Sequence, residues 1–307
     1  MALPPAYADF GALVAPARAR PELWRLGAGL ALAAALYAAF VSSLMAVVWL
    51  VAGAQGFRDT LEGMTGGGGP AQTALLLFSF LGMALATWGA ARALHGRSLR
   101  SLIGADLRRA ARDFLRCFLG YGALALAAAL PFMLVMDVEP NLAPGTWLLW
   151  LGPALALLVL QVGAEEMLFR GWLQSQLAAR LTRPALWLGL PALVFGLAHY
   201  APAQSGPNAW AVVGAVTLFG LIAGDLTARS GTIGAATGFH LANNTLAILI
   251  LSTDGAIDGL SLWRTGFAAD DPGLAPLLLI DAAVLVAGWA LCRRLIARPA
   301  AQDTGAA

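Results

Sequence analysis

Two glutamates and an arginine lie close together in a stretch of the sequence that is otherwise apolar. Glu165, Glu166 and Arg170 occur in QVGAEEMLFRGWL, which covers residues 161–173. Ionised side chains are costly at the depth of a lipid bilayer, and by default they mark a functional site. Glu166 and Arg170 are four residues apart, so in a helix they share a face and we expect them to pair. Glu165 is rotated by about 100° from that face and is free to point elsewhere.

Two further segments carry polar side chains at helical spacing. Phe195 and His199 are four residues apart in FGLAH, and His240 and Asn244 are four apart in HLANN. Side chains at this spacing project from one face of a helix. Peptide hydrolysis requires an activated water, hydrogen-bond donors for the oxyanion and a proton for the leaving amine. Carboxylate, imidazole and carboxamide groups can meet these requirements together.

The elements that must position these residues are membrane-spanning helices. The chain has 307 residues, of which 59% are hydrophobic and 12% charged, and its mean hydropathy is +0.74. Soluble domains are about half apolar and roughly a quarter charged. Each apolar run of about 20 residues must form a helix in lipid. The runs predict an all-α fold, a polytopic transmembrane bundle with about eight spans. The net charge of +2 indicates no nucleic-acid partner.

The pattern divides the chain into three regions. Residues 1–140 form an N-terminal transmembrane region of about three helices, with a basic amphipathic cytoplasmic segment at 97–116. Residues 141–255 form the core with the polar motifs, and residues 256–307 hold an acidic loop, the last span and a tail. Every second loop, beginning with the segment before the first span, is rich in arginine. Short cytoplasmic loops are enriched in arginine, so we expect both termini in the cytoplasm. The absence of lysine favours a bacterial source and its inner membrane.

The three motifs also agree in depth. At about 1.5 Å rise per residue from the nearest basic residue that ends each span, Glu165 lies at about 22 Å, His199 at about 24 Å and His240 at about 16 Å. Three helices thus bring polar side chains to similar heights, which favours one shared site.

At these positions the sequence resembles a known family. EEMLFRG, FGLAH and HLANN are similar to the motifs EExxxR, FxxxH and HxxxN of the CPBP family of intramembrane proteases, which comprises CAAX prenyl endopeptidases and bacteriocin-processing or self-immunity (Abi) proteins. The resemblance covers about residues 149–251. It implies an enzyme embedded in the lipid bilayer that hydrolyses a peptide or membrane-protein substrate. Since most bacteria do not prenylate proteins, we do not expect CAAX cleavage.

The resemblance also implies roles for the motif residues. Glu165 is expected to act as the general base with His199 holding the same water, while His240 and Asn244 donate hydrogen bonds to the oxyanion. Glu166 with Arg170 would be structural support, and Phe195 would pack or line the cavity. No cofactor is expected to be required. The alternative is a zinc ion held by Glu165, His199 and His240, with a water in the open position.

Two other readings of the bundle stay open at this point. A transporter or channel would use the buried ionisable groups as an ion or proton pathway, and a catalytically idle homologue would act as a scaffold or immunity protein. Asp281, inside the last predicted span, is expected to pair or to extend toward the interface, with a proton site as the alternative. His95, in the basic sequence ALHGR, is expected to be solvated.

Overall fold

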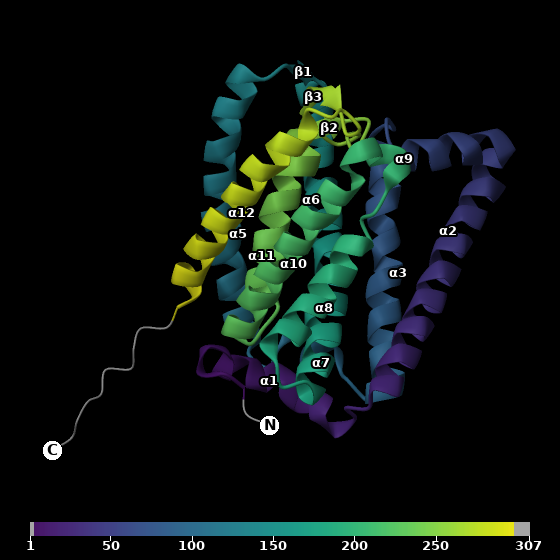
Figure 1. Cartoon of the computed structure of the whole chain (residues 1–307). Helices are drawn as coiled ribbons and strands as arrows, with labels where there is room; N and C mark the ends of the chain where they lie inside the picture. The colour runs from purple at the N-terminus through teal and green to yellow at the C-terminus, as the bar shows by residue number, and fades with distance from the viewer. Residues whose placement is uncertain (1–2, 298–307) are drawn as a thin grey trace.

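The computed structural model describes residues 3–297 as a bundle of long helices with a small sheet at one end (Figure 1). Its elements are, in chain order, η1 (Pro5–Phe10), α1 (Gly11–Val14), η2 (Ala15–Ala19), α2 (Leu23–Thr65), α3 (Pro70–His95), α4 (Leu99–Ile103), α5 (Leu107–Val135), β1 (Val138–Pro140), α6 (Pro144–Glu166), η3 (Met167–Gln174), α7 (Ser175–Arg180), α8 (Pro184–Leu197), α9 (Pro202–Ser205), η4 (Gly206–Asn208), α10 (Ala209–Ser230), α11 (Gly234–Asn244), η5 (Thr245–Ile250), β2 (Leu251–Asp254), β3 (Trp263–Ala268) and α12 (Leu274–Ile296).

Long apolar helices dominate the described part of the chain. Within residues 3–297, six helices are long and apolar enough to cross a membrane. The prediction of an all-α polytopic bundle, and hence of an integral membrane protein, is confirmed. The count of about eight spans is not. Two of the expected spans correspond to shorter elements, namely α8 with 14 residues and the pair formed by α11 and η5.

The first long helix changes direction at a glycine. Gly53 in α2 has a φ of 72°, a left-handed conformation that glycine adopts without steric cost. The part before Gly53 runs along the bundle, and the part after it turns sideways at the end where the sheet lies (Figure 1). The break therefore lets one continuous segment cross the apolar layer and then follow its surface.

The sheet was not expected from the sequence. Its strand order is β1-β3-β2, with β1 antiparallel and β2 parallel to β3. The strands follow α5 and η5 and precede α12, so the sheet ties the ends of three separate helical segments together. This fixes α12 against the core that carries the motifs.

The basic segment at 97–116, expected to be amphipathic, is not one continuous helix. Gly104 has a φ of 131° and separates α4 from α5, which continues directly into a membrane span. Arg97 is 1% exposed, and its guanidinium donates to Ser101 and to the Ser175 hydroxyl. His95, expected in water, is 3% exposed and accepts a hydrogen bond from the Trp172 indole at 3.3 Å. Both side chains connect elements inside the protein.

Close contact between α5 and α11 positions one of the motifs. Gly234 and Gly238 of α11 lie against the backbone carbonyls of Ala110 and Phe114 in α5, where a Cβ atom would approach each oxygen to 2.1 Å. Small residues four apart let two membrane helices pack backbone to backbone. The following turn of α11 carries His240, so this contact holds the imidazole at a fixed depth.

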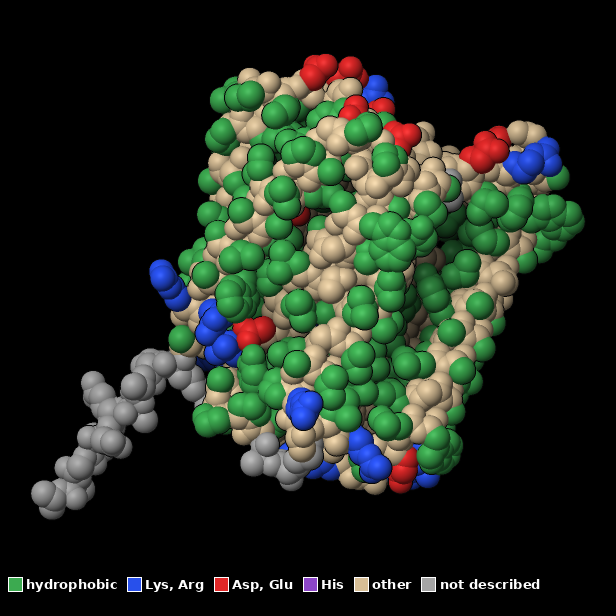
Figure 2. All heavy atoms as spheres, viewed as in Figure 1, with side chains coloured by type: hydrophobic (Ala, Val, Ile, Leu, Met, Phe, Trp, Pro, Cys, Tyr) green, Lys and Arg blue, Asp and Glu red, His purple; other side chains and the backbone are tan. Residues whose placement is uncertain are grey.

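Charges gather at the two ends of the bundle, with an apolar surface between them (Figure 2). Acidic side chains predominate at the end that carries the sheet, and basic side chains predominate toward the end that carries α1 and α7. The apolar middle is the surface that a bilayer would cover.

Candidate active site

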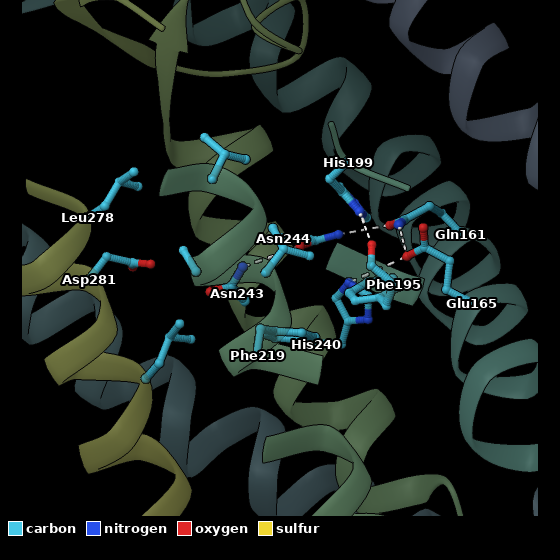
Figure 3. A pocket seen from close by; sticks show the side chains of 14 residues that line it. Gln161, Glu165, Phe195, His199, Phe219, His240, Asn243, Asn244, Leu278 and Asp281 are labelled. Carbon is cyan, nitrogen blue, oxygen red and sulfur yellow. Dashed lines mark hydrogen bonds and ion pairs between the residues drawn. The ribbon is translucent and has the colours of Figure 1, made fainter. Parts of the chain in front are cut away.

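Four predicted side chains from three helical segments line one cavity of about 240 Å³ (Figure 3). Glu165 comes from the last turn of α6, His199 follows the end of α8, and His240 and Asn244 come from α11. The structure therefore brings together the side chains that the motifs place at similar depth. Glu165 and Asn244, the first and last of these four residues, are 79 positions apart in the sequence.

Glu165 is 6% exposed and has a partner that the sequence reasoning missed. The Gln161 side-chain amide donates from Nε2 to Glu165 Oε2 at 2.5 Å, and its Oε1 accepts from Asn244 Nδ2 at 2.9 Å. Gln161 therefore links α6 to α11 and orients two predicted site residues at once. The available signal was its position one helical turn before Glu165, on the same face of the helix.

Glu166 is fully buried beside Glu165 but contacts different groups. Its Oε1 lies 3.0 Å from Arg170 Nη1 and 2.9 Å from His240 Nδ1. The predicted ion pair between Glu166 and Arg170 is confirmed. The Arg170 guanidinium also donates to the Gly220 carbonyl at 3.3 Å and lies 4.7 Å from the Phe195 ring centroid. These contacts connect η3 with α8, α10 and α11 around a compensated pair of charges.

His240 lies between the two adjacent carboxylates. Its Nδ1 faces Glu166 at 2.9 Å, and its Nε2 is 3.5 Å from Glu165 Oε2. An ionised carboxylate only accepts, so the ring nitrogen close to Glu166 carries a proton. The longer contact of Nε2 exceeds ordinary hydrogen-bond distances. Glu166 thus fixes the orientation of the imidazole, and Nε2 remains available to a bound molecule.

The ring of His199 is fixed by the backbone of its own motif. Its Nδ1 lies 2.8 Å from the Phe195 carbonyl oxygen. A carbonyl only accepts, so Nδ1 carries the proton and Nε2 is left as an acceptor, which suits the binding of a water hydrogen. The Phe195 ring packs edge-on against His199 and lines the cavity, as predicted.

Asn244 belongs to a row of amides. Asn243 Nδ2 donates to Asn244 Oδ1 at 3.4 Å, and the Tyr121 hydroxyl donates to Asn243 Oδ1 at 3.1 Å. With Gln161, this row extends from α5 through α11 to α6. Asn243 thus orients Asn244, a role that spacing alone does not indicate.

Asp281 forms the opposite wall of the cavity together with Leu278 and Leu285, all on α12. Among the described residues it has no hydrogen bond or ion pair, so the expectation that it pairs with another side chain is wrong. The physical reason is its orientation, because its carboxylate points from α12 into the cavity toward Asn243 (Figure 3).

The zinc alternative requires Glu165, His199 and His240 to direct their donor atoms at one point. Within residues 3–297, no three His, Cys, Asp or Glu side chains are grouped as ligands of one metal ion would be. The Nδ1 atoms of His199 and His240 face oxygen atoms of the protein, which leaves the Nε2 atom of each ring on the cavity side. The zinc alternative stays a prediction, and the chemistry proposed for this site uses no metal.

Two π-helical turns adjoin the motifs. The segment η3 begins directly after Glu166, and η5 begins directly after Asn244. π-helical turns are rare and occur frequently at functional sites, where they change the direction of side chains relative to a regular helix. The sequence offers no periodic signal for them.

The fold and the cavity together define an integral membrane protein with a carboxylate, two imidazoles and amides in one intramembrane site. Residues 146–246 match the family of type II CAAX prenyl endopeptidase Rce1-like proteins. This segment contains all three motifs, so the resemblance to the CPBP family is confirmed there.

The chain is also 31% identical over 179 residues to the uncharacterized protein YyaK of Bacillus subtilis (strain 168). The alignment covers 56% of this chain and 58% of YyaK, so the chain spans less than two thirds of that relative. No solved structure is significantly similar to the chain.

Proposed function

We propose that the protein is an intramembrane endopeptidase that hydrolyses a peptide bond in a peptide or membrane-associated protein. The observation that carries this proposal is the convergence of Glu165, His199, His240 and Asn244 on one cavity. The match of residues 146–246 to a family of CAAX prenyl endopeptidases supports it independently. The two alternative functions are a transporter or channel and a catalytically idle scaffold. Neither has a comparable observation in its favour.

In the proposed reaction, the water oxygen attacks the peptide carbonyl carbon while Glu165 takes the water proton. His199 Nε2 accepts the second water hydrogen and so holds the nucleophile in place. The oxyanion receives hydrogen bonds from the Asn244 amide and from His240 Nε2–H, an interaction that often contributes several kcal/mol. Because His240 Nδ1 already donates to Glu166, this step uses the imidazolium form of His240, which carries a proton on both ring nitrogens. Glu165 then delivers its proton to the leaving amine as the carbon–nitrogen bond breaks.

Hydrolysis is proposed to proceed without a metal. The ligand types support this, since within residues 3–297 no three His, Cys, Asp or Glu side chains are grouped as the ligands of one metal ion would be. Elemental analysis of purified protein that has been shown to be active tests whether a metal is bound. Stoichiometric zinc that is needed for turnover would refute this part.

Replacement of Glu165 by Gln tests the function itself. Glu165→Gln keeps the shape of the side chain but removes the base, and we expect at least a thousandfold loss of cleavage with unchanged expression. Substrate trapping with this variant, followed by mass spectrometry, should recover a protein that accumulates uncleaved. Asp59→Asn, an exposed change in the part of α2 that follows Gly53, is the control. Full turnover by Glu165→Gln would reject the mechanism, and the absence of any cleaved partner in the unmodified strain would favour the scaffold.

We further propose that the protein lies in a bacterial inner membrane with both termini in the cytoplasm. The separation of basic and acidic side chains to opposite ends of the bundle supports this orientation. Prenylated CAAX proteins are not the proposed substrates, because prenylation is uncommon in bacteria.

A further inference from the structure

Asp281 differs from every other acidic side chain in the candidate spans. Asp59, Asp113, Glu165, Glu166, Asp225 and Glu62 each have a partner in the described part of the chain. Asp281 has none among the same residues, although it lies eight residues into a helix that can cross the membrane. An unpaired carboxylate at this depth is costly, and such groups mark binding or transport sites.

The surroundings of Asp281 point to the charge of its missing partner. The cavity lining contains Glu165 and Asp281 but no arginine, and the chain has no lysine. The protein itself therefore supplies no fixed positive charge to this cavity wall. A cation on a bound molecule would satisfy Asp281 by a charge-assisted hydrogen bond, which is stronger than a neutral one.

The end of the bundle that carries the sheet has the same sign of charge as Asp281 (Figure 2). The loops at 136–143 and 251–273 contain six acidic residues and one arginine, Arg264, which bridges Glu139 and Asp254. The Asn208 side chain donates to the carbonyls of Ala269 and Asp271 at 3.0 and 2.7 Å. This contact holds the acidic loop against the segment that follows His199. A molecule that enters from this end meets negative charge before it meets the cavity.

We propose that Asp281 forms a cation subsite, which binds the guanidinium or ammonium group of a substrate residue close to the cleaved bond. The cation must belong to a nearby residue because Asp281 and Glu165 share one cavity of about 240 Å³. Asn243, toward which the carboxylate points, lies between them (Figure 3). The inference rests on the proposed function in that it names the class of peptide that the protease accepts, namely one with a basic side chain next to an apolar segment.

The test measures binding separately from cleavage. Full-length Glu165→Gln protein in lipid nanodiscs is titrated with fluorescent apolar peptides in which one arginine is moved along the sequence. Each peptide has a twin with citrulline, which keeps the shape of arginine without its charge. We expect the best arginine peptide to bind about ten- to a hundredfold more tightly than its twin, the range for one hydrogen bond to a charged group. Adding Asp281→Asn should reduce the ratio to within about twofold, while Asp59→Asn, on the surface segment of α2, should leave it unchanged.

Each outcome decides one of the two proposals. Equal binding of the twins, no binding of either, or an arginine preference that survives Asp281→Asn would overturn the cation subsite, whether or not the peptides are cleaved. If arginine-selective binding depends on Asp281 but protein with Glu165 intact cleaves none of the peptides, the subsite stands and the protease assignment fails. If cleavage requires Glu165 and the preference requires Asp281, both stand.

Discussion

Replacement of Gln161 by Leu tests whether the catalytic groups are positioned from α6. Gln161 donates to Glu165 at 2.5 Å and accepts from Asn244 at 2.9 Å, so one side chain orients both the proposed base and an oxyanion donor. Leucine has a similar size but no polar atoms. The substitution therefore removes the hydrogen bonds that orient Glu165 and Asn244. Leucine still fills most of the space of the Gln161 side chain, which is 7% exposed.

The magnitude follows from the two hydrogen bonds that are lost. A bond to a charged group contributes about 1.5–3 kcal/mol, and a neutral one contributes about 0.5–1.5 kcal/mol. If both are maintained in the transition state, the sum is about 2–4.5 kcal/mol, which corresponds to roughly a 30- to 2,000-fold fall in kcat/KM. The fall should appear in kcat, since Gln161 orients reacting groups and does not bind the remote parts of the substrate.

The assay follows hydrolysis of a substrate recovered by trapping, with the rate divided by the fraction of folded protein. Gln174→Leu is the matched control, because Gln174 is another buried glutamine that donates to the Gly224 carbonyl at 3.0 Å, outside the cavity lining. Gln174→Leu should lower the melting temperature without lowering turnover per folded molecule. The reasoning is refuted if Gln161→Leu stays within threefold of the unsubstituted protein, or if both variants lose activity equally.

Two further predictions concern the scaffold. Gly238→Ala places a methyl group 2.1 Å from the Phe114 carbonyl oxygen and should destabilise the protein by about 1–3 kcal/mol. Gly214→Ala is the control, because its methyl group meets no atom within 4 Å and should not destabilise the protein. Equal melting temperatures of the two variants would contradict the close contact of α5 and α11. Burial, together with its hydrogen bond to Asp225, raises the pKa of Tyr7 from 10.0 to about 12, so its contribution to stability is complete below pH 10 and is lost as the pH rises toward 12. Tyr7→Phe should remove this loss in melting curves recorded across that range, and an unchanged pH dependence would show that other groups cause it.

The motif residues could be predicted because helical spacing and depth are simple geometry. Glu166 and Arg170 pair as their spacing requires, and the helices that carry Glu165, His199 and His240 meet because their polar groups would otherwise face lipid. The long helices could be predicted for the same reason, since backbone groups in a bilayer must bond within the segment.

What could not be predicted depends on contacts between segments far apart in sequence. The burial of His95 depends on Trp172, 77 residues away, and the Asp281 wall depends on the path of α12 beside the cavity. Gln161 is chemically ordinary until α11 brings Asn244 to its other end. The small sheet also results from long-range pairing, because β1 and β3 are joined by a connection of more than a hundred residues.

The adjacent glutamates differ in role because one residue of helical rotation gives them different neighbours. Glu166 is turned into the protein, where Arg170 and the Nδ1 of His240 compensate its charge and where no water is needed. Glu165 is turned toward the cavity, where a neutral amide orients it and no arginine binds it. A carboxylate that is paired with arginine is a weak base, because the adjacent positive charge favours its ionised form. Glu166 binds Arg170, so Glu165 remains free of arginine and can act as the base. His240 contacts both, and it therefore couples the compensated charge in the interior to the reactive one at the cavity.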